Sequence, residues 1–397
     1  MTFAPAKRPP LWLLVIITIS GTMAMHMFVP ALPYATADLR APVGQMQMTV
    51  SFYIIGLAVG QLFYGPMSDS LGRRPMLIAG LALYTAGGLA AALAPGVYTL
   101  VGARLVQAFG GCAGLALGRA IVRDSTHSED MVRQLALMNL MIMVSPGLSP
   151  MVGGVVSTAL GWRAIFWLTA ALGAATLVIT WKLLPETAPP GRSLSIGTLA
   201  SDYRALLRSR RFVGLALGGG CATTAVYAFI AAAPFIFVTD LHRPVHEVGL
   251  YLGLLIFGMS FGNAFTGRMV GKIGIERLML AGNVLSIVSA AGLLATVLLG
   301  RLDVAGTLVW MFLFTLGTGI TSPAALTKAI SVNPQLTGSA AGLYGFAQMA
   351  TGAVCTSLVA LGDDPARSAT TVLLAAALTA FVAFRVALGG KSELVST

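Results

Sequence analysis

The chain has 397 residues, of which 56% are hydrophobic and only 10% are charged, and its mean hydropathy is +0.84. A soluble domain carries roughly 25% charged residues, so the composition excludes a water-soluble globular protein. Long apolar runs favour membrane-spanning helices over a β-barrel. The net charge of +11 does not indicate a nucleic-acid partner, because the basic residues gather in loops on one side of the predicted spans.

Twelve apolar windows predict an all-α polytopic membrane protein with twelve transmembrane helices. An even number of spans places both termini on the same side of the membrane. The longest polar stretch, the linker 185–211, separates an N-terminal six-helix bundle, 1–184, from a C-terminal one, 212–397. The predicted spans are 11–33, 47–66, 76–94, 97–118, 134–156, 163–184, 213–238, 248–268, 277–299, 306–330, 337–361 and 367–388.

The distribution of Lys and Arg predicts the orientation of these spans. Lys7 and Arg8 precede the first window without a convincing cleavage site, so we interpret 11–33 as an uncleaved first span. Most of the 25 basic residues share the side of the termini, which we therefore expect to be cytoplasmic. The exceptions are Arg40, Arg104, Arg163, Arg243, Arg301 and Arg367.

A polar cassette, GPMSDSLGRRP, separates the second and third predicted spans. Its two glycines allow a tight turn, and its arginines can pair with carboxylates of neighbouring helices. We predict a cytoplasmic gate in which Asp124, beyond the fourth span, forms an ion pair with one of the arginines. The alternative is a solvated pair worth less than about 1 kcal/mol. The candidate gate residues of the cassette are Gly65, Asp69, Gly72, Arg73 and Arg74.

The fourth span begins near residue 97 and places Arg104 and Gln107 within the membrane. A charged side chain inside a span costs on the order of 2.5–3.5 kcal/mol on insertion scales, so Arg104 indicates a partner or a water-filled cavity. The alternative is an arginine that snorkels to the outer interface, since it lies roughly 10 Å from the start of the helix at 1.5 Å per residue.

The fifth span is rich in proline and glycine. Proline removes a backbone hydrogen bond and glycine admits a neighbouring backbone, so we expect a bent helix with a close neighbour. A plain kink without a further role is the alternative. The motif consists of Ser145, Pro146, Pro150, Gly153 and Gly154.

The linker and the second half also carry informative patterns. The basic stretch 201–211 is interpreted either as a short helix on the anionic inner leaflet or as a charged connector. Gly267 and Gly274 have the same spacing as Gly65 and Gly72, and each pair follows the second span of its half. This repetition fits the duplicated architecture of many secondary transporters.

Polar and aromatic side chains within the spans are candidates for a substrate cavity, and helix packing is the alternative role for each. Tyr344 and Gln348 are four residues apart, so they share one face of a helix. The candidates are Gln107, Asn139, Tyr227, Asn263, Tyr344 and Gln348.

Nothing in the sequence indicates an enzyme, a metal centre or a cofactor. His242 and His246 are four residues apart but lack a third ligand. No Ser/His/Asp set and no phosphate-binding loop is present, and the absence of a soluble domain disfavours a receptor. The cysteines lie in apolar segments without disulfide or metal-ligand spacing, and they are Cys112, Cys221 and Cys355.

Short motifs of different sequence are distributed along essentially the whole chain. They are VPALP at 29–33, the cassette at 65–75, RLVQAFGG at 104–111, RD at 123–124, SPGLSPMVGG at 145–154, GWRAIFW at 161–167, LPET at 184–187, AAAPFIF at 231–237 and LTGSAAGLYGFAQ at 336–348. With these motifs the chain resembles the major facilitator superfamily, and in particular its Bcr/CflA branch of twelve-span drug efflux transporters. The resemblance implies two pseudo-symmetric halves, a bacterial inner-membrane location and export driven by proton entry.

One residue departs from this branch. His26 stands where the branch typically has aspartate, four positions before Pro30, and none of the 14 acidic residues falls in the middle of a predicted span. Histidine can exchange a proton near neutral pH. We therefore hypothesise that His26 couples transport to protons and that Arg104 disfavours its protonated form in a dry cavity. A neutral histidine that is hydrogen-bonded within the bundle is the alternative.

These observations predict a secondary active transporter that exports small drugs or metabolites by alternating access in exchange for protons. The proton gradient is the expected energy source, without a cofactor. An uncoupled facilitator or an importer of a small metabolite is the alternative, because no span offers a central carboxylate. A cavity with His and Arg suits neutral or anionic substrates. The six-plus-six layout needs no partner subunit, so we expect a monomer in the lipid bilayer.

Overall fold

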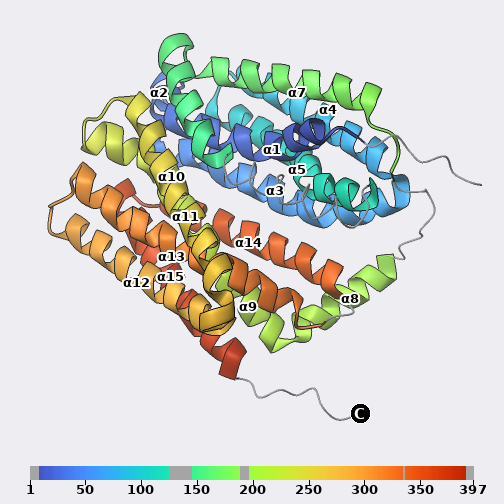
Figure 1. Cartoon of the computed structure of the whole chain (residues 1–397). Coiled ribbons are helices and arrows are strands. Elements are labelled where there is room, and N and C mark those ends of the chain that lie inside the picture. The colour runs from blue at the N-terminus through green and yellow to red at the C-terminus, as the bar shows by residue number, and fades with distance from the viewer. Residues whose placement is uncertain (1–8, 126–144, 188–195, 334–335, 390–397) are drawn as a thin grey trace, which may run out of the picture. The chain divides into compact units, whose positions relative to one another are not determined.

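The computed structural model describes residues 9–125, 145–187, 196–333 and 336–389, and these are almost entirely helical (Figure 1). Within them, eleven helical stretches are long and apolar enough to cross a membrane. The predicted fifth span falls partly outside the described residues, but 145–160 are helical. The chain is therefore an all-α, multi-pass membrane protein, as its composition predicts.

A 3₁₀ turn (Val29–Ala31) and a π-helical turn (Ile236–Asp240) interrupt the labelled helices. The helices are α1 (Leu11–Phe28), α2 (Leu32–Asp38), α3 (Val43–Leu71), α4 (Arg73–Ala92), α5 (Val97–Ser125), α7 (Arg163–Leu183), α8 (Ile196–Arg208), α9 (Arg210–Thr224), α10 (Val226–Phe235), α11 (Val245–Ile273), α12 (Ile275–Leu298), α13 (Val304–Ile330), α14 (Thr337–Ala360) and α15 (Pro365–Gly389).

The chain divides into two compact units. The first unit comprises residues 1–194 together with 244–253, and the second comprises residues 195–243 together with 254–397. The helix α8, which lies in the predicted linker, groups with the second unit. The start of α11 groups with the first unit, and the rest of α11 with the second.

Proline accompanies irregular helix in two of the spans. The first span is longer than predicted, Leu11–Asp38, and is interrupted by the 3₁₀ turn at Pro30. Proline cannot donate a backbone hydrogen bond, and its ring crowds the preceding turn. In the span Arg210–Asp240, Pro234 in α10 precedes the π-helical turn. Both spans are thus assembled from shorter helical pieces.

The polar cassette, which the sequence predicts as a turn between two spans, is mostly helical. The helix α3 continues to Leu71 and α4 begins at Arg73, so only Gly72 lies between them. Gly72 has a φ of +96°, a conformation that favours glycine. Gly65 lies inside α3, and nothing lies near the place of its missing side chain. The turn therefore depends on Gly72, and the predicted contribution of Gly65 to it is wrong.

In the first unit, α5 contacts α1, α3 and α4, and glycines allow these helices to approach closely. A Cβ on Gly21 of α1 would lie 2.8 Å from the carbonyl oxygen of Gly111 of α5. A Cβ on Gly114 would overlap the carbonyl oxygen of Ile17. The helix that carries Arg104 is therefore packed on several sides by other helices of its unit.

In the second unit, α9 packs against α13, α14 and α15. The junction between α11 and α12 repeats the one between α3 and α4, because Gly274 alone separates the two helices and has a φ of +86°. The spacing of the glycine pairs in the sequence thus reflects a shared backbone feature. The first glycine of each pair, Gly65 or Gly267, lies within a helix and is not part of the junction.

Candidate functional site

Arg104, on α5, is fully buried in the first unit. Its Nη1 donates hydrogen bonds to the backbone oxygen of Ala24, 3.2 Å away, and to Oε1 of Gln107, 2.7 Å away. Gln107 in turn donates to Oγ1 of Thr169 on α7 over 3.4 Å. The network joins α5 to α1 and α7 around a single cation. The alternative prediction, that Arg104 snorkels to an interface, is wrong.

The guanidinium of Arg104 lies among aromatic rings. Its Cζ is 3.9 Å from the ring centroid of Tyr53, 5.4 Å from that of Phe28 and 5.5 Å from that of Phe166. The Tyr53 hydroxyl donates to the carbonyl oxygen of Gly21 over 2.6 Å, which holds the ring in place. Nε and Nη2 of Arg104 have no hydrogen-bond partner among the described residues. Two donors of a buried cation are therefore available to a bound group.

Neither Tyr53 nor Thr169 was predicted as a site residue. Both are fully buried, and each lies in an apolar span where an aromatic ring or a threonine is an ordinary packing residue. Threonine commonly returns its hydroxyl to the preceding turn of its own helix, as Thr169 does with the carbonyl of Phe166. No pattern in the sequence distinguishes these two residues from their neighbours.

His26 is almost fully buried on α1, two residues after Ala24. Its Nδ1 lies 2.8 Å from the carbonyl oxygen of Thr22, one turn earlier. A carbonyl oxygen only accepts, so Nδ1 carries the proton in this contact and Nε2 is the nitrogen that can gain or lose one. Arg104 reaches the same turn of α1 through Ala24. Backbone carbonyls of one stretch of α1 thus bind both predicted interior groups, Arg104 and His26. The role of His26 in proton coupling stays a prediction.

The glycines of the fifth-span motif bring its helix onto the same part of α1. A Cβ on Gly153 would overlap the carbonyl oxygen of Met27, the residue after His26. A Cβ on Gly154 would lie 3.3 Å from the Cα of His246, at the start of α11. The predicted close backbone approach is confirmed. The same helical stretch carries the other motif residues, Ser145, Pro146 and Pro150.

Arg73 lies in a charged cluster at the end of the first unit where α3 passes into α4. Its Nε donates to Oδ2 of Asp124 on α5 over 3.1 Å, and its Nη1 lies 2.5 Å from Oδ1 of Asp69. The hydroxyl of Ser68 accepts a further hydrogen bond from Nη1. Although it is charged, Arg73 is only 7% exposed. The predicted ion pair between Asp124 and a cassette arginine is present, and it involves Arg73.

Glu186 belongs to this cluster and was not predicted as a site residue. Its carboxylate accepts hydrogen bonds from the backbone N–H groups of Arg73, at 2.9 Å, and of Arg74, at 3.2 Å, in the first turn of α4. A negative charge is favourable at a helix N-terminus, where unpaired amides and the helix dipole face it. A Cβ on Gly72 would lie 2.6 Å from this carboxylate. The glycine therefore provides both the turn and the room for Glu186.

In the second unit, Tyr344 and Gln348 share one face of α14, as predicted, and both contact α9. Nε2 of Gln348 donates to Oγ1 of Thr223 over 2.8 Å. A Cβ on Gly219, one turn before Thr223, would overlap the Tyr344 hydroxyl. This hydroxyl is buried and has no hydrogen-bond partner among the described residues. A buried unpaired polar group costs about 1–3 kcal/mol, so Tyr344 is a second place where the interior can accept a polar ligand.

The other predicted interior residues lie elsewhere. Tyr227 lies against α14, where a Cβ on Gly352 would be 3.0 Å from its ring, and Asn263 is half-buried on α11. Asn139 lies outside the described residues. Asn283, which was not singled out, is fully buried and donates to a backbone carbonyl of α15 over 3.0 Å. Among the described residues, no group of three or more His, Cys, Asp or Glu side chains is placed to hold a metal ion.

Comparison with known proteins identifies the family. Residues 14–356 match the Major Facilitator Superfamily. The chain belongs to this superfamily. The Multidrug resistance protein D of Escherichia coli is 30% identical to it over 88% of each chain. The Bicyclomycin resistance protein homolog of Haemophilus influenzae is 26% identical over 87% of each chain.

The same architecture is found in solved structures of the superfamily. A bacterial homologue of the human lysosomal transporter Spinster superposes with a TM-score of 0.73 at 14% identity, covering 96% of this chain and 97% of that one. This similarity confirms the predicted major facilitator fold. The curated relatives confirm the resemblance to Bcr/CflA-type drug transporters. The chain is therefore a multi-pass membrane protein of a small-molecule transporter family.

Proposed function

We propose that this superfamily member is a secondary active transporter that exports small drugs or metabolites across the bacterial inner membrane, by alternating access and in exchange for protons. The observation that carries the proposal is the Arg104 network. A fully buried cation whose Nε and Nη2 have no partner among the described residues is costly unless a bound group or a second conformation uses them. The names of the relatives, which refer to drug resistance, support export as the direction.

The Arg73 cluster supplies a gate at the cytoplasmic end of the first unit in this proposal. The excess of Lys and Arg in the loops on that side supports cytoplasmic termini. Breaking the contacts of Arg73 with Asp69 and Asp124 exposes a largely buried guanidinium, so opening requires that water or a new partner reach it. The cluster thus favours one state of the transport cycle and is lost in the other.

Neutral or anionic compounds are the proposed substrates. The acidic residues of the described spans lie at or near span ends, whereas Arg104 and His26 lie inside them. A desolvated site with this composition favours an acceptor group such as a carboxylate or a carbonyl over a cation. The proton gradient is the proposed energy source, with His26 as the proton-carrying residue. One chain holds all of these groups, which fits a monomer.

A second function, an uncoupled facilitator or importer, is favoured by the same absence of a central carboxylate in the described spans. Counterflow without a pH gradient, measured together with accumulation driven by a pH gradient, separates the two functions. A facilitator exchanges labelled for unlabelled substrate without a pH gradient but does not accumulate it against a gradient. A proton-coupled exporter accumulates substrate inside inverted vesicles when the vesicle interior is acidic.

The direct test is a susceptibility and efflux panel in a bacterial strain that lacks its own pumps, with the chain present in the membrane at a measured level. We expect at least a several-fold fall in the accumulation of some neutral or anionic compounds, and we expect a proton uncoupler to abolish it. Efflux that continues at the same rate with the uncoupler would support the facilitator. Increased accumulation would support the importer.

A further inference from the structure

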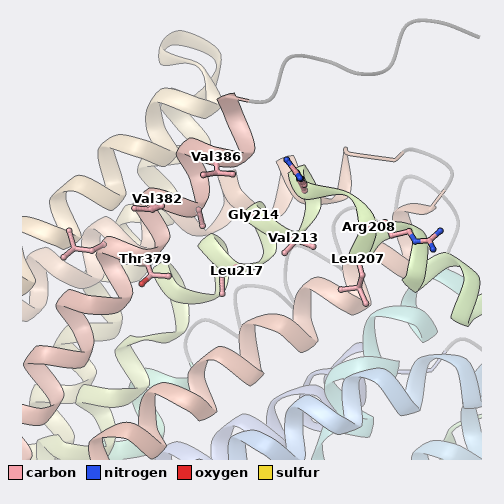
Figure 2. Close-up of a pocket in the computed structure, with 11 residues that line it drawn as sticks. Leu207, Arg208, Val213, Gly214, Leu217, Thr379, Val382 and Val386 are labelled. Carbon is pink, nitrogen blue, oxygen red and sulfur yellow. The ribbon is translucent and has the colours of Figure 1, made fainter.

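An apolar groove with a basic rim runs along the outer surface of the second unit, between α9 and α15 (Figure 2). Its volume is about 630 Å³. The side chains of its walls are mostly aliphatic, and several are exposed although they belong to membrane-spanning helices. Such a surface faces lipid. The residues that define its course are Leu207, Val213, Leu217, Thr379, Val382 and Val386.

The rim of the groove is built to attract an anion. Arg208 is the last residue of α8 and Arg210 the first of α9, and both are exposed and line the groove. Ser209 caps α9, because its Oγ accepts from the N–H of Phe212 over 3.3 Å. The first N–H groups of a helix have no acceptor within it, and the helix dipole is positive there. Among the described residues that line the groove there is no carboxylate.

Contacts of α8 with the second unit hold this rim in place. The hydroxyl of Ser339 on α14 donates to Oδ2 of Asp202 over 3.1 Å. Leu206 is only 2% exposed. Tyr203 lies on the same helix, and its burial together with the Asp202 carboxylate raises the pKa of its phenol. Arg208 is therefore the end of a docked helix rather than part of a free connector.

A second apolar groove, of about 430 Å³, continues the first. The two share Leu217 and Thr379, and the second extends to Leu358 on α14. At 1.5 Å per residue, the distance along α9 from Arg210 to Cys221 is roughly 16 Å. The two grooves thus provide an apolar track that leads from a positive rim towards the middle of the bilayer. Such a track matches a molecule with an anionic head and a long apolar tail.

We propose that this groove binds an anionic phospholipid, with its phosphate at Arg208, Arg210 and the N-terminus of α9 and one acyl chain along α9 and α15. Any bilayer supplies acyl chains to a lipid-facing groove. The basic rim adds a preference for a negatively charged headgroup at the membrane surface. A zwitterionic lipid lies in the same groove without this preference.

Native mass spectrometry of the full chain in detergent, with phosphatidylglycerol and phosphatidylcholine of identical acyl chains, tests the proposal. Two guanidiniums near the surface predict about a 30-fold preference for phosphatidylglycerol, or ~2 kcal/mol at 1.4 kcal/mol per tenfold. In the Arg208→Gln/Arg210→Gln variant we expect the preference to fall below about threefold. The matched control is Arg277→Gln, an exposed arginine in the first turn of α12 outside the groove, which should keep it.

A second variant tests the contact with the acyl chain of the lipid rather than the contact with its headgroup. Val382→Trp fills the groove while leaving both arginines in place, and it should lower retention of phosphatidylglycerol at least several-fold. The proposal is overturned if both variants, folded by their thermal unfolding, retain the lipid as the wild type does. Displacement of the lipid by millimolar glycerol phosphate would also overturn it, because the site would then bind a soluble anion. The readout is lipid binding, so it does not depend on the proposed transport function.

Discussion

At the scale of single residues, Arg104 depends on the shape of the guanidinium as well as on its charge. The planar group lies over the Tyr53 ring and donates within its plane to the carbonyl of Ala24 and to Gln107. An ammonium group has no flat face to stack and no fork of donors. A lysine at this position would therefore keep the charge without the stack and the fork of donors.

Arg104→Lys should reduce the efflux rate about 30-fold. A desolvated cation–π contact is worth about 2 kcal/mol or more, and the substitution removes the stack and the geometry of the fork while keeping the charge. The measurement is the initial rate of efflux of a substrate found in the panel, normalised to the amount of protein in the membrane.

The matched control for this prediction is Arg163→Lys. Arg163 also lies over an aromatic ring, with its Cζ 4.2 Å from the centroid of Trp162, but its side chain is 39% exposed. An exposed stack is worth only about 0.5–1 kcal/mol, so the efflux rate should change less than about fivefold. Equal effects of the two substitutions would contradict a special role for the buried stack.

The sequence identified Arg104 and the cassette but not the residues around them. A charge inside an apolar run is conspicuous by itself, whereas Tyr53 is one aromatic residue among many. Glu186 lies in a short motif, but more than a hundred residues separate it from the amides of Arg73 and Arg74 that it binds. Contacts of this kind depend on how helices are arranged, which the local sequence does not encode.

At the scale of helices, the junction of α3 with α4 at Gly72 and that of α11 with α12 at Gly274 are followed by charges of opposite sign. In the second unit, Glu276 in the first turn of α12 pairs with Lys328 in the last turn of α13 at 2.5 Å. Both charges there complement the helix dipoles. In the first unit, Arg73 is the first residue of α4 and Asp124 lies in the last turn of α5. Each of these charges has the sign that is unfavourable for the dipole of its helix. Glu186 supplies the missing negative charge at α4, so this junction depends on a contact from outside its own helices.

Double-mutant cycles on the two ion pairs should give different coupling energies. The side chains of Arg73 and Asp124 are 9% and 22% exposed, whereas those of Lys328 and Glu276 are 22% and 48% exposed. A charge-assisted hydrogen bond with a buried partner contributes about 1.5–3 kcal/mol, and an exposed pair about 0–1 kcal/mol. The cycles use Arg73→Gln with Asp124→Asn, and Lys328→Gln with Glu276→Gln, with the free energy of unfolding in detergent as the measurement. A larger coupling energy at the second pair would refute this ranking.

Helix boundaries were predicted less well than helix identities. The predicted spans 47–66 and 248–268 are shorter than α3 and α11, which extend beyond them at both ends. A hydropathy window detects the apolar part of a helix only, whereas the backbone hydrogen bonds continue into polar residues. For this reason the cassette was predicted to separate the two spans, although most of it belongs to α3 and α4.

At the scale of the whole molecule, the fold was the easiest property to predict. In lipid every backbone polar group must be satisfied within the protein, so apolar runs of sufficient length become helices with few alternatives. The motifs along the chain then indicated the superfamily, which residues 14–356 match. Coupling to protons depends instead on the protonation of one or two side chains and not on the arrangement of helices.

His26→Ala tests whether His26 couples transport to the proton gradient. In proteoliposomes, an imposed pH gradient should no longer drive substrate accumulation, with a loss of at least tenfold, because the acidic residues of the described spans lie at or near the span ends and cannot replace the buried imidazole. Counterflow without a gradient should continue, since Arg104 and Gln107 still form the interior network. His246→Ala is the control, because His246 is exposed at the start of α11.

If pH-driven accumulation is undiminished in His26→Ala, another group carries the proton. If counterflow is lost as well, His26 binds substrate rather than coupling its movement to protons.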